Sequence, residues 1–144
     1  MKARDVMSSP VITVRPDTPG FAAAALLAAH GFTAVPVVDA TGRIIGMATE
    51  ADLIRGRIVP EGWTVEPESE PTVREVMTES PISRRPDDDL ADVVADLLDH
   101  HIRSVPIVDG DRLVGIVSRR DVLRCVARRE LNSDQVLGRR ADRS

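Results

Sequence analysis

The sequence is poor in aromatic residues, cysteine and lysine. Phe, Trp and Tyr make up 2% of its 144 residues, Tyr is absent, and Lys2 is the only lysine. Few aromatic side chains leave little to stack on nucleic-acid bases, and a net charge of -4 does not attract a polyanion. The single cysteine, Cys125, excludes an internal disulfide and fits a reducing compartment. These scarcities predict a protein that does not bind nucleic acid.

Long apolar runs are missing as well. No run approaches the roughly 18 residues that a membrane-spanning helix needs. The first ten residues, "MKARDVMSSP", contain no apolar stretch of the signal-peptide type. The apolar fraction, 42%, is ordinary for a globular protein. We therefore expect a cytoplasmic protein with no membrane partner.

What the chain does contain is a repeat with a spacing of about seventy residues. Three stretches match: "DVMSSPVITVRPD" (5–17) with "EVMTESPISRRPD" (75–87), "HGFTAVPVVD" (30–39) with "HHIRSVPIVD" (100–109), and "RIIGMATEADLIR" (43–55) with "RLVGIVSRRDVLR" (112–124). One copy of about fifty residues buries too little surface to be stable alone. We expect the two copies to complete each other's core.

Each copy is predicted to follow the order β-α-β-β-α. "VITV" (11–14) is a short β-rich run and "PIS" (81–83) is its weaker twin. Two apolar runs on either side of a short turn predict a β-hairpin in each copy, and Pro36 and Pro106 favour an edge position for its first strand. A last helix is expected to start at Thr49 in one copy and at Ser118 in the other.

The first helix of each copy has a different composition. In the first copy it is alanine-rich, "FAAAALLAAHG", with Gly31 as a C-terminal cap. In the second copy, apolar residues recur with helical spacing. The candidates for capping the helix starts are Thr18 in the first copy and Asp88 or Asp89 in the second. The amphipathic positions of the second copy are Leu90, Val93, Val94, Leu97 and Leu98.

These signals divide the chain into four parts. The first copy covers 1–58, an acidic, proline-rich linker covers 59–72, the second copy covers 73–131, and a polar tail covers 132–144.

A hydroxyl residue followed three positions later by Asp occurs in both copies at the predicted strand-to-helix turn. Thr49 precedes Asp52, and Ser118 precedes Asp121. The spacing by itself favours a capping box, in which the two side chains satisfy free backbone N–H groups. The same turn could also bind a nucleotide, because a helix start attracts phosphate and a carboxylate accepts hydrogen bonds from a ribose diol. The two interpretations are compatible.

At this point each copy resembles a cystathionine-β-synthase (CBS) domain, and the chain resembles a tandem CBS pair of the small, stand-alone bacterial type. The resemblance is carried by "DVM" and "EVM", "AVPVVD" and "SVPIVD", and "GMATEADL" and "GIVSRRDV". It implies an α/β (α+β) fold in which two β-α-β-β-α units pack with pseudo-twofold symmetry. It also implies a regulatory module that binds adenine nucleotides or adenosyl compounds in two inter-unit clefts, and that often forms a homodimer.

The resemblance further implies which residues bind the ligand. It joins Thr49 and Asp52 to the first strand and pre-hairpin segment of the second copy, and the Asp121 turn to those of the first. The adenine would lie against Ile12 and Ile82, and the expected ligands are AMP, ADP, ATP or S-adenosylmethionine. One site would comprise Thr49, Asp52, Ile82, Ile102, Arg103 and Ser104, and the other Ser118, Arg120, Asp121, Ile12, Phe32, Thr33 and Ala34.

Other chemistry has weaker support. The histidines lie at helix ends without a set of ligands at metal spacing, so no metal is expected. Cys125 has no base nearby in the sequence, and Met7 and Met77 are repeat equivalents suited to packing. Three functions therefore stay open: a sensor that passes its ligand state to an unidentified regulated protein, a structural dimerisation module with no ligand, and an enzyme, for which no nucleophile with its base is present.

Overall fold

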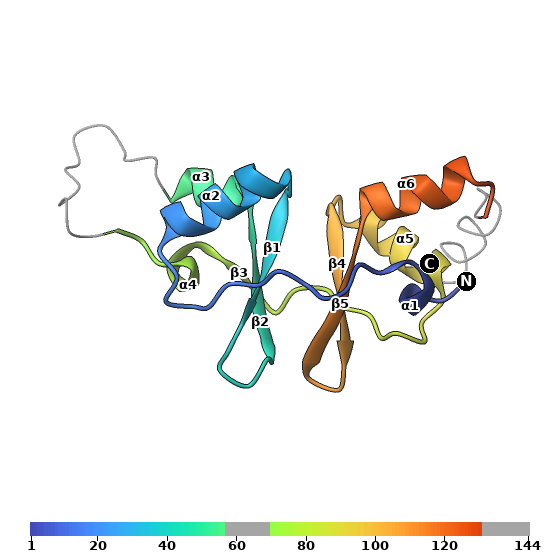
Figure 1. Cartoon of the computed structure of the whole chain (residues 1–144), viewed down its shortest axis with the longest axis horizontal. Helices are drawn as coiled ribbons and strands as arrows, with labels where there is room; N and C mark the ends of the chain where they lie inside the picture. Colours follow the sequence, from blue (N-terminus) through green and yellow to red (C-terminus); the bar gives the residue numbers. More distant parts are fainter. Residues whose placement is uncertain (57–69, 131–144) are drawn as a thin grey trace. The chain divides into compact units, whose positions relative to one another are not determined.

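The computed structural model describes residues 1–56 and 70–130. It divides into two compact units. The N-unit comprises Ile12–Pro81, and the C-unit comprises Met1–Val11 together with Ile82–Ser144. The protein is thus built from two small α+β units of the same plan (Figure 1).

The N-unit packs its helices against an antiparallel sheet with the order β1-β2-β3 (Figure 1). Its core combines Ala23 and Leu27 with strand residues such as Val35 and Val37, because alternate residues of a strand face the same side. The elements are α2 (Gly20–His30), β1 (Ala34–Val38), β2 (Ile44–Thr49), α3 (Glu50–Arg55), α4 (Val73–Val76) and β3 (Thr78–Glu79).

The C-unit repeats this plan with a two-stranded sheet. Its core combines Leu90, Val93 and Leu97 with Val105 and Ile107. The elements are α1 (Ala3–Val6), α5 (Leu90–Asp99), β4 (Ser104–Asp109), β5 (Arg112–Ser118) and α6 (Arg119–Ala127).

The two hairpins confirm the prediction from the sequence. Strand β1 pairs with β2, and β4 pairs with β5, and both pairings shift register toward the end of the first strand, at Val37/Val38 and Ile107/Val108. The prediction for the prolines is also confirmed, because β1 lies at the edge of its sheet and both strands of the second sheet are edges.

The predicted strand at 11–14, and its twin at 81–83, are not formed. Instead, a single residue bridges the neighbouring strand in parallel in each copy: Val14, at the end of the first segment, bridges Val37, and Arg84, directly after the second segment, bridges Ile107. Prolines lie close to the bridging residue in each copy, at Pro16 and Pro86, and proline has no N–H to extend a ladder. The first β of each predicted β-α-β-β-α unit is therefore reduced to one bridging residue.

The predicted helix of the second copy is confirmed as α5, with Asp89 as the N-cap, whose side chain accepts from the Ala91 N–H at 2.9 Å. Leu98 was expected in the amphipathic face but is 47% exposed. Thr18 and Asp88 do not cap the helices; they accept from the backbone N–H of Arg15 and Arg85, respectively, in the preceding turn. Gly31 ends α2 in the left-handed region, with φ of 69°, as expected of a C-terminal glycine.

The first segment of each sequence copy packs in the unit formed mainly by the other copy. The division of the chain by packing therefore differs from its division by sequence copy. In the C-unit, the Ala3 N–H donates to the Asp88 carbonyl at 2.9 Å and the Leu90 N–H to the Met1 carbonyl at 2.8 Å. In the N-unit, the equivalent bonds run from Val73 to Thr18 and from Gly20 to Pro71, both at 2.8 Å. Each core is thus completed by a residue of the other copy, Ala3 in one and Val73 in the other.

The exchange explains why the repeat contains both a methionine and a glycine. The side chain of Met77 lies against Gly46, where an added Cβ would meet its sulfur at 2.6 Å. Met7 lies against Gly115 in the same manner. The prediction that these methionines pack is confirmed, and a side chain at either glycine would collide with them.

Two sequence predictions fall largely outside the described residues. These are the tail at 132–144 and most of the linker at 59–72, including Trp63. At the end of that linker, Glu70 and Pro71 pack in the N-unit, because the Glu70 carboxylate accepts from the Phe21 N–H at 3.2 Å. Over the described residues, no helix is long and apolar enough to cross a membrane.

Candidate functional site

The two hydroxyl-x-x-Asp turns form complete capping boxes. In the N-unit, the Asp52 N–H donates to Thr49 Oγ1 at 3.1 Å, and the Thr49 N–H donates to Asp52 Oδ2 at 3.0 Å. In the C-unit, the equivalent distances between Ser118 and Asp121 are 3.2 and 2.8 Å. Each turn therefore fixes the end of a hairpin strand against the start of a helix.

Both carboxylates are buried, at 4% exposure for Asp52 and 7% for Asp121. An arginine one turn further along each helix reaches the carboxylate oxygen that the box leaves open. Arg55 Nη2 lies 2.6 Å from Asp52 Oδ1, and Arg124 Nη1 lies 3.3 Å from Asp121 Oδ1. The side chains of these arginines are 69% and 59% exposed, so each guanidinium binds its carboxylate from the solvent side.

The third hydrogen bond to each carboxylate has a different donor in the two units. Asp52 Oδ2 accepts from the Thr78 hydroxyl at 3.3 Å, so the exchanged strand β3 contacts this turn. Asp121 Oδ2 accepts from the hydroxyl of its own cap residue, Ser118, at 3.0 Å. A carboxylate has about four acceptor positions. With three donors, each has one position left for a further hydroxyl group.

The segment before each hairpin is bonded to the turn of the same unit. The Glu50 N–H donates to the Thr33 carbonyl at 3.0 Å, and Ala34 pairs with Thr49. In the C-unit, the Arg119 N–H donates to the Arg103 carbonyl at 2.9 Å. The grouping of a turn with the segment of the other copy, which the resemblance implies, stays a prediction.

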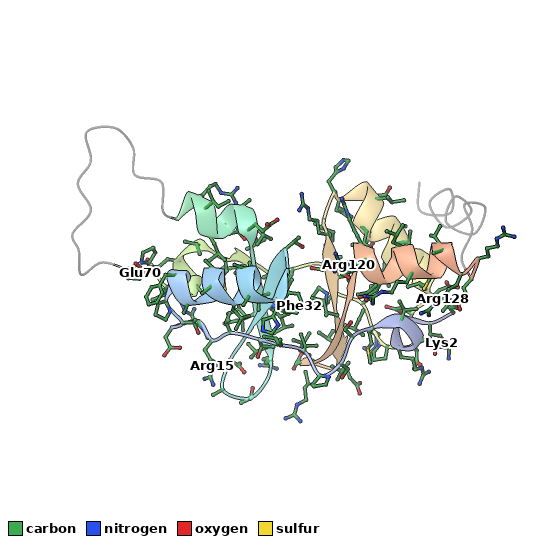
Figure 2. The ribbon with its side chains drawn as sticks, turned by 45° about the horizontal axis from the view of Figure 1, so that its top comes forward. Lys2, Arg15, Phe32, Glu70, Arg120 and Arg128 are labelled. Carbon is green, nitrogen blue, oxygen red and sulfur yellow. The ribbon has the colours of Figure 1, made fainter. Side chains whose placement is uncertain are left out.

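The predicted site residues differ in exposure. Phe32 lies between α2 and β1, and Arg120 lies on the first turn of α6, as labelled in Figure 2. Phe32 is 40% exposed and its ring stacks on His30, with 5.1 Å between the ring centres. Ile12 and Ile82 are each 37% exposed, which leaves apolar surface for a flat ring. Arg103 and Arg120 are exposed, and Thr33, Ala34, Ile102, Ser104, Thr49 and Ser118 are partly buried.

Three contacting residues were not predicted from the sequence: Arg55, Arg124 and Thr78. The first two have a visible signal, because "DLIR" and "DVLR" place an arginine three residues after each Asp. Thr78 has no such signal, since it lies 26 residues from Asp52 in the sequence.

Two other candidate chemistries have little structural basis. Cys125 is buried in the core of the C-unit, and burial raises the pKa of its thiol, which disfavours the reactive thiolate. Within residues 1–56 and 70–130, no three His, Cys, Asp or Glu side chains come together as a metal site.

Two hairpin-and-helix units, each carrying the same capped turn with a buried carboxylate, define a tandem-repeat module. Residues 3–58 and 73–128 each match the CBS domain family. The chain therefore belongs to the CBS domain family, as a tandem pair.

Known proteins agree with this assignment. The chain is 35% identical over 119 residues to the CBS domain-containing protein YhcV of Bacillus subtilis (strain 168), covering 83% of this chain and 81% of YhcV. Other relatives are longer: the chain spans 22% of the L-aspartate semialdehyde sulfurtransferase of Methanocaldococcus jannaschii, with 29% identity over 122 residues.

Solved structures with the same fold include complexes with adenosine-containing compounds. The CBS domain pair of protein MJ0100, in complex with 5′-methylthioadenosine and S-adenosyl-L-methionine, is similar with a TM-score of 0.77 and 27% identity. CBSX2 in complex with AMP is similar with a TM-score of 0.76 and 25% identity. Each match covers 90% of this chain and 98% of the other.

Proposed function

We propose that this protein is a regulatory CBS pair that binds an adenosine-containing ligand, namely AMP, ADP, ATP or S-adenosylmethionine, and passes the ligand state to a regulated protein. The observation that carries the proposal is the pair of buried carboxylates, Asp52 and Asp121, each at the start of a helix and each with one acceptor position left. The adenosine compounds bound by MJ0100 and CBSX2 support the same ligand class.

The geometry suits a ribose diol in particular. A cis-diol brings two O–H donors side by side, and a carboxylate can accept both. One ribose hydroxyl donates to the open acceptor position of Asp121. The other ribose hydroxyl takes the place of the exposed Arg124 at Asp121 Oδ1. The exchange is feasible because the ribose hydroxyl replaces the hydrogen bond that Arg124 gives up, and the arginine side chain is already 59% exposed. The same exchange is available to Asp52 and Arg55.

The remaining proposed contacts are to the adenine, the ribose and the phosphate of the ligand. The exposed apolar side chains of Ile12 and Ile82 flank the adenine. Thr49, at the start of α3, donates its hydroxyl toward phosphate or the ribose, whereas the Ser118 hydroxyl remains bound to Asp121 Oδ2 and accepts from the ligand. The contacts to the base and the phosphate are completed by Phe32, Thr33, Ala34, Ile102, Arg103, Ser104 and Arg120.

A thermal-shift panel tests the proposal. A ligand that binds only the folded state raises the melting temperature, and the rise grows with ligand concentration. We expect a rise with at least one of AMP, ADP, ATP and S-adenosylmethionine, with a dissociation constant of roughly 1 μM, about -8 kcal/mol. Inorganic phosphate serves as the control for phosphate alone, and cytidine monophosphate, which has the same ribose and phosphate, serves as the control for the adenine base. No shift with any adenine compound at millimolar concentration would reject the proposal.

We propose no turnover of the ligand. Incubation of the pure protein with ATP is expected to leave the nucleotide intact over hours, as read by chromatography. Product that increases steadily and follows the protein through purification would contradict this.

The second candidate function is a dimerisation module, and we propose that two copies associate. Helix α2 contains no charged residue between Gly20 and Ala29, and Phe21 on it is 56% exposed. Light scattering at tens of micromolar is expected to give twice the monomer mass of 15.7 kDa. Phe21→Glu is expected to shift the protein toward the monomer, and a monomeric wild-type protein would contradict the proposal.

A further inference from the structure

The first residue of α6, Arg119, binds the segment that precedes β4. Its Nε–H donates to the Ile102 carbonyl at 3.0 Å, and its backbone N–H donates to the Arg103 carbonyl at 2.9 Å. One residue therefore holds two successive carbonyl groups. It ties the segment that carries Ile102, Arg103 and Ser104 to the start of the helix that carries Asp121.

The neighbouring arginine is in a different situation. Arg120 is exposed, and no hydrogen bond or ion pair among the described residues involves it. Its position on the first turn of α6 can be followed in Figure 2. The two arginines are adjacent in the sequence, but Arg119 donates its Nε–H to a carbonyl, whereas none of the five N–H donors of Arg120 is used within residues 1–56 and 70–130.

The N-unit holds the equivalent segment by other means. The residue equivalent to Arg119 is Glu50, whose backbone N–H makes the matching bond to Thr33, at 3.0 Å. Its carboxylate has no proton to donate to the carbonyl of Phe32. Instead, the Phe32 ring stacks on His30, with an interplanar angle of 13°. The segment before the hairpin is thus fixed by a side chain in both units, by an arginine in one and by a ring pair in the other.

We propose that Arg119 is a positioning residue for the adenosine part of the ligand, and that Arg120 is the guanidinium that contacts phosphate. The inference rests on the proposed function. If Arg119 turned toward a phosphate, the Ile102 carbonyl would lose its donor. Holding the segment in place beforehand lowers the ordering cost of binding equally for every adenosine ligand, whatever its charge. A contact to phosphate acts only on charged ligands and weakens with salt.

Calorimetric titration of adenosine, AMP and ATP at two salt concentrations separates the two roles. Arg119→Met keeps the length of the side chain and removes its donors. We expect Arg119→Met to weaken the binding of all three ligands by a similar factor, about three- to tenfold, as for the loss of one hydrogen bond. The salt dependence of binding should not change. Arg120→Met is expected to leave the affinity for adenosine unchanged, to lower the affinity for ATP more than that for AMP, and to reduce the salt dependence of binding. Glu50→Met is the matched control, because it places the same side chain at the equivalent position of the N-unit, and it should not change the binding of adenosine.

A second measurement does not depend on a ligand. Arg119→Met is expected to speed amide hydrogen exchange in residues 102–104, whereas Arg120→Met should leave it unchanged. The inference is overturned if Arg119→Met weakens only AMP and ATP, or if it changes neither binding nor exchange while the wild-type protein binds adenosine. If the wild-type protein binds none of the three ligands, the proposed function is rejected together with the ligand part of this inference. The exchange result then shows separately whether the contact to Ile102 holds the segment.

Discussion

The N-unit and the C-unit present the same backbone around different interiors. Val14 and Arg84 occupy equivalent positions, and each donates its backbone N–H to the proline of the adjacent strand at 3.0 Å. In the N-unit, Val14 is buried in the core, and Leu26 packs against the same core. In the C-unit, Arg84 binds Asp96, the residue equivalent to Leu26. The repeat therefore fixes the main-chain contacts, while the side chains beside them have diverged from an apolar pair to an ion pair.

The ion pair has the geometry of a strong one. Arg84 Nε lies 2.6 Å from Asp96 Oδ2, Nη2 lies 3.1 Å from Oδ1, and the Asp96 side chain is 1% exposed. The hydrogen bonds to Asp96 raise the pKa of Arg84 further above its already high value. Arg84 therefore stays charged at any physiological pH, and its protonation is not expected to change the stability between pH 6 and 9.

The largest expected effect comes from removing only one member of this pair. Arg84→Val removes both hydrogen bonds that the guanidinium donates to the buried Asp96 carboxylate, and we expect a loss of about 3–5 kcal/mol in the free energy of unfolding. The double variant Arg84→Val with Asp96→Leu copies the N-unit. It is expected to lie close to the wild type or above it, since a packed apolar pair often matches a buried ion pair. Denaturant unfolding followed by circular dichroism measures both. A double variant as unstable as the single one would show that the two interiors are not interchangeable.

The glycines on which the methionines pack give the next comparison. A Cβ at Gly46 would meet the Met77 sulfur at 2.6 Å and also the Thr78 carbonyl oxygen at 2.9 Å, which belongs to the backbone. At Gly115, the three nearest atoms all belong to the side chain of Met7, and the two nearest of them, the sulfur and Cγ, can move by rotation of that side chain. We expect Gly46→Ala to cost about 1–3 kcal/mol of stability, and Gly115→Ala to cost less. Thermal unfolding of the two variants tests the order, and equal losses would contradict it.

Much of this symmetry could be predicted from the sequence, because its signals are local. The hairpins, α5 and the two capped turns each depend on residues a few positions apart, such as Asp89 before Leu90 or Thr49 before Asp52. Helices α1 and α4 were missed because four residues are too few to show a period. The exchanged segments and the Thr78 contact were missed because their partners lie far away in the sequence.

The misread segment has a physical cause as well. Val11, Ile12 and Val14 have the β-branched composition of a strand, but only Val14 makes the bonds of a ladder. Composition indicates an extended backbone, but it does not indicate how many of its residues form hydrogen bonds with a neighbouring strand. The exposure of Leu98 was missed for a similar reason, since periodicity assigns a face to a helix but not the width of the surface that covers it.

The two turns should also differ in their affinity for charged ligands. The turn of the C-unit contains Arg120, whereas the corresponding turn of the N-unit contains Glu50 and Ala51. A partly exposed charge contact contributes about 0.2–1 kcal/mol, so we expect the Asp121 turn to bind ATP roughly fivefold more tightly than the Asp52 turn. The advantage should shrink with added salt. Titration of Asp52→Asn and Asp121→Asn with ATP at two salt concentrations measures the difference. Loss of the tighter binding in Asp52→Asn alone would reverse the order.

The central claim is that the buried Asp of each turn both caps a helix and binds the ribose of an adenosine ligand. The most direct test is the double variant Asp52→Asn with Asp121→Asn, titrated with the adenosine compound that gives the largest thermal shift. An asparagine keeps one oxygen to accept the cap N–H, so the melting temperature should fall by only a few degrees for a loss of about 1 kcal/mol. The affinity should fall by tenfold or more, because the charged acceptor of the diol is lost. A double variant that folds and binds the ligand as tightly as the wild type would contradict the claim.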